Sequence, residues 1–103
     1  MITPLPRPVG VPRRIQLSRR KGWKIPAGTI VVSRPSRWGN PYRARTPDER
    51  RVAVAKYARF IQSPRGRILR QNAIKYLRGY NLACWCPLDG PCHGDVLLEL
   101  VNA

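Results

Sequence analysis

The feature that most constrains this chain is how its charge is distributed. All twenty lysines and arginines lie before residue 80, whereas residues 80–103 contain none and carry three acidic residues. Long basic side chains are rarely buried in a protein core. We therefore expect the front of the chain to build a basic surface, and its apolar end to supply core and a special site.

The overall balance of charge points to a polyanionic partner. A formal net charge of +15 on 103 residues suggests nucleic acid or a nucleotide. The alternative is that the excess arginine only keeps a small protein in solution. The length allows one domain, and a hydrophobic content of 43% is enough for a modest core. No run of about 18 apolar residues exists, so we expect no membrane span and no membrane partner.

Proline stands at nearly every second position near the start of the chain. This pattern predicts an extended, mobile arm over residues 1–12, followed by a single domain over residues 13–103. Such a segment cannot form the apolar stretch of a signal peptide. Three cysteines are an odd number and make no disulfide framework, so we expect a cytoplasmic protein with metal or redox chemistry at its cysteines.

Hydrophobic patterns predict elements in the order β-β-α-α-β-α. The run of β-branched residues at 29–33 is typical of a strand buried on both faces. Thr46 and Glu49 form a capping box with Pro47 at the first helical position. The fold expected from this order is a small α/β domain, in which a short, partly parallel sheet packs with about three helices. The predicted strands cover residues 13–18, 29–33 and 81–86, and the predicted helices cover 46–62, 64–78 and 96–101.

Functional groups in such sheets gather beyond the carboxyl ends of the strands. Two loops would lie there, at residues 34–42 and 86–95. The first is rich in arginine and aromatic residues, which suits base stacking and phosphate contact. The alternative is that Trp38 fills the core and the loop is a plain turn. The candidate residues for binding nucleic acid or phosphate are Arg34, Ser36, Arg37, Trp38 and Asn40.

The second loop holds most of the groups suited to catalysis or metal binding. Three thiolates and one imidazole, from Cys84, Cys86, Cys92 and His93, make a complete tetrahedral set for zinc. Alternation along a strand points Cys84 and Cys86 to the same face. The adjacent Cys92 and His93 converge only if the chain turns sharply, which the neighbouring proline and glycine allow. This interpretation makes zinc the expected cofactor.

Two other interpretations of the same residues stay open. Cys92 or His93 would lie at the entry to the last helix, where the helix dipole stabilises an anion and lowers the pKa of a thiol. With Asp95 or Asp89 beside it, His93 is then a candidate general base, and the catalytic set is Cys92, His93 and Asp95. Alternatively, Cys84 and Cys86 are inert core residues, Asp95 caps the helix, and His93 satisfies a backbone carbonyl.

Three segments carry a family resemblance: RIQLSRRKGWKIP, VVSRPSRWGNPY and NLACWCPLDGPCHGDVLLEL. Together they resemble a family of small phage and bacterial proteins, domain-of-unknown-function family 4326, which is marked by an RPSxWGNP-like loop and a C-terminal CxC...PCHGDVL signature. The match spans residues 13–100. The resemblance implies that residues 34–41 and residues 84–95 form one site. It also implies a phage-linked context, hence the cytoplasm of a bacterial host, but no particular reaction.

Three functional hypotheses follow. The first is a phage-type protein that associates with nucleic acid, with a zinc-binding Cys/His cluster and with Trp38 or Trp85 stacked on a base. The second is a small enzyme that acts on nucleotides or nucleobases through Cys92 and His93. The third is a basic adaptor that binds an acidic host protein and has no chemistry of its own.

Overall fold

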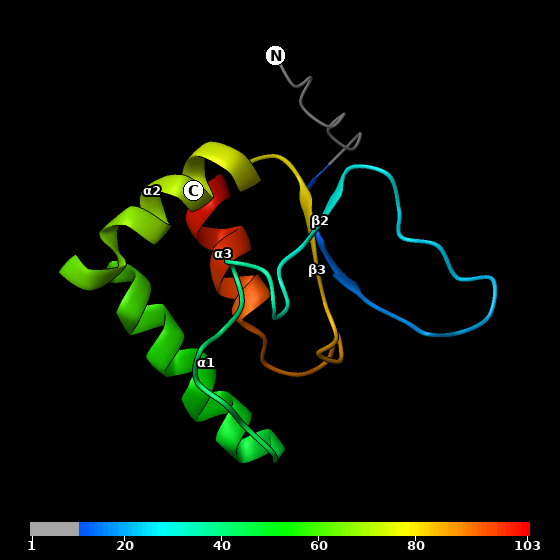
Figure 1. Ribbon diagram of the computed structural model, residues 1–103, viewed down its shortest axis with the longest axis horizontal. Helices are drawn as coiled ribbons and strands as arrows, with labels where there is room; N and C mark the ends of the chain where they lie inside the picture. Colours follow the sequence, from blue (N-terminus) through cyan, green and yellow to red (C-terminus); the bar gives the residue numbers. More distant parts are fainter. Residues whose placement is uncertain (1–10) are drawn as a thin grey trace.

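The computed structural model describes residues 11–103 and shows the predicted small α/β fold (Figure 1). The predicted arm at residues 1–12 lies almost entirely outside the described residues. Along the described chain the elements follow the predicted order β-β-α-α-β-α. They are β1 (Arg14–Gln16), β2 (Thr29–Val31), α1 (Pro47–Gln62), the 3-10 turn η1 (Pro64–Gly66), α2 (Arg67–Leu77), β3 (Asn81–Cys84) and α3 (His93–Asn102).

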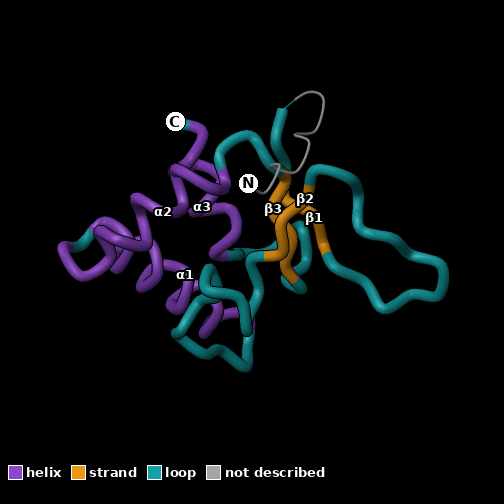
Figure 2. The backbone as a smooth tube through the Cα atoms, turned by 45° about the horizontal axis from the view of Figure 1, so that its top comes forward, coloured by secondary structure: helices purple, strands orange, loops and turns teal. Residues whose placement is uncertain are grey.

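The three strands form a parallel sheet in the order β1-β3-β2. Ile15 pairs with Ala83 on one side of β3, and Val31 pairs with Ala83 on the other. The last strand in sequence is therefore the central one, and all four of its residues are buried. Figures 1 and 2 show the helices on one side of this sheet, while the long connection from β1 to β2 extends away on the other side.

The prediction that residues 29–33 form a strand buried on both faces is wrong. β2 is an edge strand in which Thr29 and Ile30 are only half-buried, and Val31 is 39% exposed. β-Branched residues fit any pleated, half-buried surface, so their presence does not distinguish an edge strand from a central one. The fully buried position belongs to β3.

α1 starts as its sequence predicts. The hydroxyl oxygen of Thr46 accepts a hydrogen bond from the Glu49 backbone N–H at 3.1 Å. The Glu49 carboxylate accepts in turn from the Arg45 backbone N–H at 2.8 Å, so the reciprocal bond falls one residue earlier than in a standard capping box. Ala53, Tyr57 and Ile61 form the buried stripe of this helix.

α2 ends where a glycine allows it, because Gly79 takes a positive φ of 86° directly after the helix. Its buried residues are Ala73 and Leu77, whereas Tyr76 is 46% exposed. In residues 11–103, no helix combines the length and apolar character that crossing a membrane requires.

α3 begins at His93, three residues earlier than predicted. The residue before it, Cys92, is extended and caps the helix, because its sulfur accepts a hydrogen bond from the Gly94 backbone N–H at 3.4 Å. Asp95 lies in the first turn, so the interpretation that Asp95 is the cap is wrong. Cysteine is not among the usual N-cap residues, and the sequence pattern therefore placed the start of this helix too late.

The hydrophobic core lies between the sheet and the helices. As the charge distribution predicts, the C-terminal segment contributes heavily to this core. The buried cluster consists of Val32, Trp38, Tyr57, Ile61, Ala73, Leu77, Leu82, Cys84, Cys92, Leu97 and Val101. Two of these residues are cysteines, so the candidate site is built into the core itself.

Candidate metal centre

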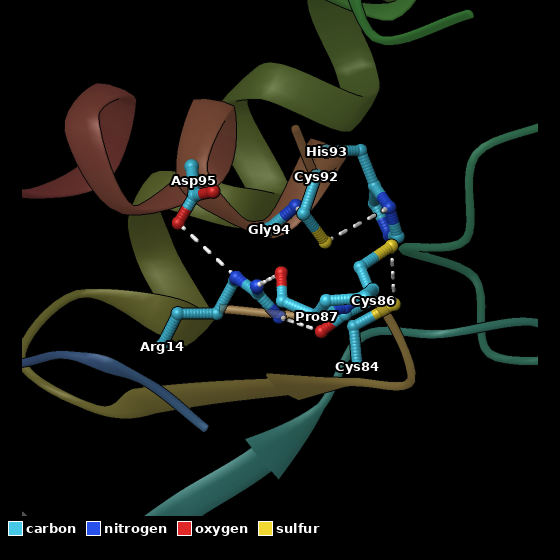
Figure 3. Close-up of polar contacts among 8 residues, drawn as sticks. All are labelled: Arg14, Cys84, Cys86, Pro87, Cys92, His93, Gly94 and Asp95. Carbon is cyan, nitrogen blue, oxygen red and sulfur yellow. Dashed lines mark hydrogen bonds and ion pairs between the residues drawn. The ribbon is translucent and has the colours of Figure 1, made fainter. Parts of the chain in front are cut away.

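Three candidate metal ligands meet at the junction between β3 and α3. Cys84 ends β3, Cys92 caps α3, and His93 is the first residue of α3. One donor atom from each lies within 4.8 Å of the other two, and all three side chains are buried. Figure 3 shows the sulfur atoms and the imidazole pointing toward one another.

Cys86 adds a fourth group beside this cluster. Its Sγ lies 3.7 Å from the Sγ of Cys84, and its side chain is half-buried. A tetrahedral zinc ion with Zn–S bonds of about 2.3 Å separates two sulfur ligands by about 3.8 Å. The two thiols are therefore already at the spacing of a shared zinc ion. The two thiols lie on the same side, as predicted, but the strand ends at Cys84, so the prediction that Cys86 belongs to the strand is wrong.

The surroundings of His93 place one hydrogen on its ring. Nε2 lies 2.8 Å from the carbonyl oxygen of Val32, and a carbonyl can only accept, so Nε2 carries a hydrogen. Nδ1 lies 4.0 Å from the Sγ of Cys92 and is the nitrogen that faces the thiols. The bond to a backbone carbonyl was predicted for an inert histidine, but it is also what orients most metal-binding histidines.

The sharp turn that this cluster needs occurs between Cys92 and His93. Cys92 is extended, with φ −151° and ψ 140°, and the helix starts at the next residue. Gly94 then allows close packing, since a Cβ there would lie 3.2 Å from Cδ of Arg14 and 3.5 Å from Sγ of Cys92. The glycine of the CHGD segment is thus explained by the crowding around the cluster.

Arg14 holds the loop after β3 in place, although sequence reasoning gave it no role. Its guanidinium is buried and donates to the carbonyl of Cys86 at 2.9 Å and to the carbonyl of Pro87. Its Nε lies 3.3 Å from an oxygen of Asp95 (Figure 3). The structure therefore places Asp95 on Arg14, on the other side of the helix start from the imidazole of His93. The only signal for this role is an arginine within a predicted strand.

Hydrogen bonding among the thiols shifts their ionisation. Bonds from Cys86 and Cys92 lower the pKa of Cys84, because both stabilise its thiolate. The same interaction with Cys84 raises the pKa of Cys86 and that of Cys92. The cluster thus favours one thiolate that is shared by its neighbours, and thiolate is the form in which cysteine binds a metal.

A pocket of about 280 Å³ opens beside the cluster. It brings together the loop after β2, the first turns of α1 and the end of β3. The residues that line it include two arginines and no aspartate or glutamate. They are Ser33, Arg34, Asn40, Tyr42, Ala44, Arg50, Ala53, Val54, Cys84, Trp85, Cys86 and His93.

Two of the residues predicted to bind nucleic acid are used elsewhere. Trp38 is only 5% exposed and belongs to the core, so the alternative interpretation of this residue is correct and stacking of Trp38 on a base is wrong. The guanidinium of Arg37 lies 4.4 Å from the centre of the Trp38 ring and 5.0 Å from that of Tyr76. Arg37 is exposed and is not among the residues that line the pocket.

Of the other three predicted residues, two lie beside the cluster. Arg34 and Asn40 line the pocket, whereas Ser36 does not, and its hydroxyl is buried without a hydrogen-bond partner among the described residues. The amide of Asn40 is fully engaged. Its Nδ2 donates to the carbonyl of Ala53 at 3.2 Å, and its Oδ1 accepts from the Tyr42 N–H at 2.9 Å. Asn40 thus fixes the loop against α1.

Comparison with known proteins identifies the family of the chain. Residues 15–103 match the family described as Domain of unknown function (DUF4326). The chain belongs to this family. It is also 31% identical over 74 residues to the uncharacterized 12.4 kDa protein in the nrdA-td intergenic region of Enterobacteria phage T4, and the match covers 71% of this chain and 67% of the phage protein. No solved structure matches the chain.

The family resemblance predicted from three segments is therefore confirmed. In this DUF4326 protein, the loop after β2 and the CHGD segment do meet in space, because Arg34 and Asn40 line the same pocket as Cys84 and His93.

Proposed function

We propose that this chain is a zinc-stabilised domain that binds nucleic acid, with zinc held by Cys84, Cys86, Cys92 and His93. One observation carries the proposal. Three buried donors within 4.8 Å of one another, and a fourth sulfur 3.7 Å from Cys84, lie beside a pocket that two arginines line. A metal site and a site for anions therefore share one edge of the sheet.

The donor set favours a structural zinc site. Three thiolates and one imidazole fill all four tetrahedral positions, and closed sites of this kind stabilise folds. The second layer of contacts is also in place: Val32 orients His93, and the N–H of Gly94 donates to Cys92. Zinc at this point would join the end of β3 to the start of α3 and hold the intervening loop between them.

The charge favours nucleic acid as the partner. The net charge of +15 provides the sequence-independent attraction to phosphates that dominates such binding. The site of action in this proposal is the cytoplasm of a bacterial host, which is in keeping with the similarity to a phage protein. Reducing conditions there keep the three thiols available to zinc.

Salt-dependent binding tests the nucleic-acid part of the proposal. Fluorescence anisotropy with labelled single-stranded DNA, duplex DNA and single-stranded RNA should show affinity that falls steeply between about 50 and 200 mM salt. Absence of binding to all three at the lowest salt overturns the proposal. That result would favour the basic adaptor for an acidic host protein.

A second candidate is an enzyme that acts on nucleotides through Cys92 and His93. It is favoured by the position of His93 on the pocket wall. Against it, Cys92 is 1% exposed, and the residues that line the pocket include no carboxylate to move protons. Selective alkylation of one thiol at neutral pH, blocked by a nucleotide, would support the enzyme.

A further inference from the structure

We propose that the pocket beside the Cys/His cluster binds a single nucleotide unit, with its phosphate on Arg34 and Arg50 and its base between the pocket's aromatic side chains. The inference deepens the proposed function and rests on it, since it names the part of a nucleic acid that the site takes.

The charge of the pocket is the first argument. Among residues 11–103 the ion pairs are Arg14 with Asp95 and Arg51 with Asp48, so Arg34 and Arg50 have no acidic partner in this part of the chain. No carboxylate lines the pocket either. Two uncompensated guanidinium groups on one small pocket match a phosphate monoester, because each guanidinium can donate two parallel hydrogen bonds to phosphate oxygens.

The two arginines are held in position by the fold. Arg34 follows the end of β2, and Gly39 packs tightly against it, since a Cβ on Gly39 would lie 2.6 Å from Cγ of Arg34. Arg50 lies in the first turns of α1, three residues before Ala53. The side chain of Asn40 bonds to the carbonyl of Ala53 and so ties the loop that carries Arg34 to the helix that carries Arg50. The backbone segments that carry the two arginines are therefore held next to each other, and both side chains reach the same pocket.

The size and walls of the pocket argue for more than a bare phosphate. A volume of about 280 Å³ exceeds what one phosphate fills, and it lies near the lower end of the ~300–1,000 Å³ typical of ligand pockets. Tyr42 and Trp85 contribute aromatic surface, and Ala53 and Val54 contribute apolar surface. Trp85 is 43% exposed, with the guanidinium of Arg19 4.4 Å from the centre of its ring. Aromatic rings of this kind stack on a base without regard to its identity.

The alternative role for Arg34 and Arg50 is to balance the charge of the metal site. A zinc ion bound by three thiolates carries a net negative charge, and Arg34 and Arg50 would then only neutralise it. In that case their removal would release zinc. If they bind a nucleotide instead, their removal leaves zinc bound and weakens only the affinity for phosphate. Zinc content and nucleotide affinity therefore have to be measured on the same samples.

The test uses the full zinc-loaded chain and isothermal titration calorimetry. The probes are the four nucleoside 5′-monophosphates, adenosine, and short oligo(dT) strands with a 5′-phosphate or a 5′-hydroxyl. The variants are Arg34→Ala and Arg50→Ala. The matched control is Arg51→Ala, which removes the same charge from the same helix but outside the pocket, where Arg51 pairs with the exposed Asp48.

We expect monophosphates to bind with little preference among bases, and adenosine to bind at least about tenfold more weakly than its monophosphate. Arg34→Ala and Arg50→Ala should each lower the affinity for monophosphates by about tenfold or more, with zinc retained, while Arg51→Ala leaves it nearly unchanged. If the 5′-phosphorylated strand binds more tightly than the 5′-hydroxyl strand, the natural ligand is the end of a nucleic-acid strand. If free monophosphates bind and neither strand does, the natural ligand is a free nucleotide.

Failure of the pocket inference gives a different result from failure of the proposed function. The pocket inference is overturned if monophosphates do not bind, or if Arg51→Ala lowers their affinity as much as Arg50→Ala does. It is also overturned if Arg34→Ala and Arg50→Ala lose zinc. Binding of longer oligonucleotides that is unchanged in Arg34→Ala and Arg50→Ala overturns the pocket inference while leaving the proposed function in place. Binding of free monophosphates with no oligonucleotide binding at low salt supports the pocket and overturns the nucleic-acid function.

Discussion

Two loops leave the same edge of the sheet, and they are held in place by different means. The loop after β2, residues 34–42, is fixed by a buried indole and by the amide of Asn40. The loop after β3, residues 85–92, contains no lysine or arginine and is fixed by thiols on one side and by Arg14 on the other. The first loop supplies the positive charge of the pocket, and the second supplies soft metal ligands. Neither loop makes the site alone.

Tyr57 of α1 links the two loops. Its ring meets the imidazole of His93 edge to face, with 5.2 Å between the ring centres, and its hydroxyl donates to the carbonyl of Trp38 at 3.2 Å. Burial raises the pKa of Tyr57, so this hydroxyl stays a donor over the whole ordinary pH range. The difference between the loops predicts which substitutions remove metal and which only loosen packing.

The largest effect is expected in the loop after β3. Cys84→Ser should remove the bound zinc and lower the free energy of unfolding by more than about 4 kcal/mol, because the metal supplies folding energy at structural sites. Cys86→Ser should cause a smaller loss of zinc and a smaller loss of stability, because Cys86 is half-buried. Native mass spectrometry and thermal unfolding measure the two effects. Full metal occupancy with unchanged stability in Cys86→Ser would remove Cys86 from the ligand set.

In the loop after β2, we expect the largest loss of stability from substitution of the buried Trp38. Trp38→Ala should cost about 3–5 kcal/mol, because a fully packed indole leaves a cavity, and it should leave zinc bound. Trp85→Ala is its control: Trp85 is 43% exposed, so we expect less than about 1 kcal/mol. Chemical denaturation measures both. Equal losses for the two tryptophans would contradict the assignment of one to the core and the other to the pocket.

Removing Arg14 tests the anchor of the second loop. Arg14→Ala leaves two carbonyls and Asp95 without their partner, and we expect a loss of about 3 kcal/mol together with weaker zinc binding. Asp95 is 52% exposed, so most of this loss is assigned to the carbonyls. Arg13→Ala, on the neighbouring exposed side chain, serves as the control in urea unfolding and zinc competition assays. If both variants behave alike, the anchor has no special role.

The smallest effect is expected from the amide that ties the first loop to α1. Asn40→Ala should lower the free energy of unfolding by about 1–2 kcal/mol, because it removes two hydrogen bonds. It should also weaken monophosphate binding, since Arg34 loses its fixed position relative to Arg50. Zinc content should stay at the wild-type level. Loss of zinc in Asn40→Ala would contradict the assignment of metal binding to the loop after β3.

Local signals predicted much of the fold. The start of α1 follows from Thr46 and Glu49, whose contacts involve only neighbours in sequence. The meeting of the two loops follows from a general property of parallel strands, whose carboxyl ends share an edge. The closeness of the Cys84 and Cys86 thiols is equally local, although β3 ends at Cys84 and the strand predicted over residues 81–86 is two residues too long. Each of these features depends on periodicity or on short spacing, which a single sequence contains.

The features that were missed depend on distant contacts. Arg14 binds carbonyls 72 and 73 residues away, and nothing near it in sequence points to them. The edge position of β2 depends on how the sheet is ordered, which the spacing of apolar residues does not specify. The sequence left the burial of Trp38 open, together with the position of Cys92 at the entry to α3, and the structure confirms both interpretations.

Zinc content tests the central claim most directly. Native mass spectrometry should be carried out on full-length protein expressed without added zinc and without a histidine-rich tag. The account predicts one zinc ion per chain, lost on denaturation and absent from Cys84→Ser. A metal-free chain with all three thiols free would contradict the metal centre and leave the thiols as reactive or inert groups.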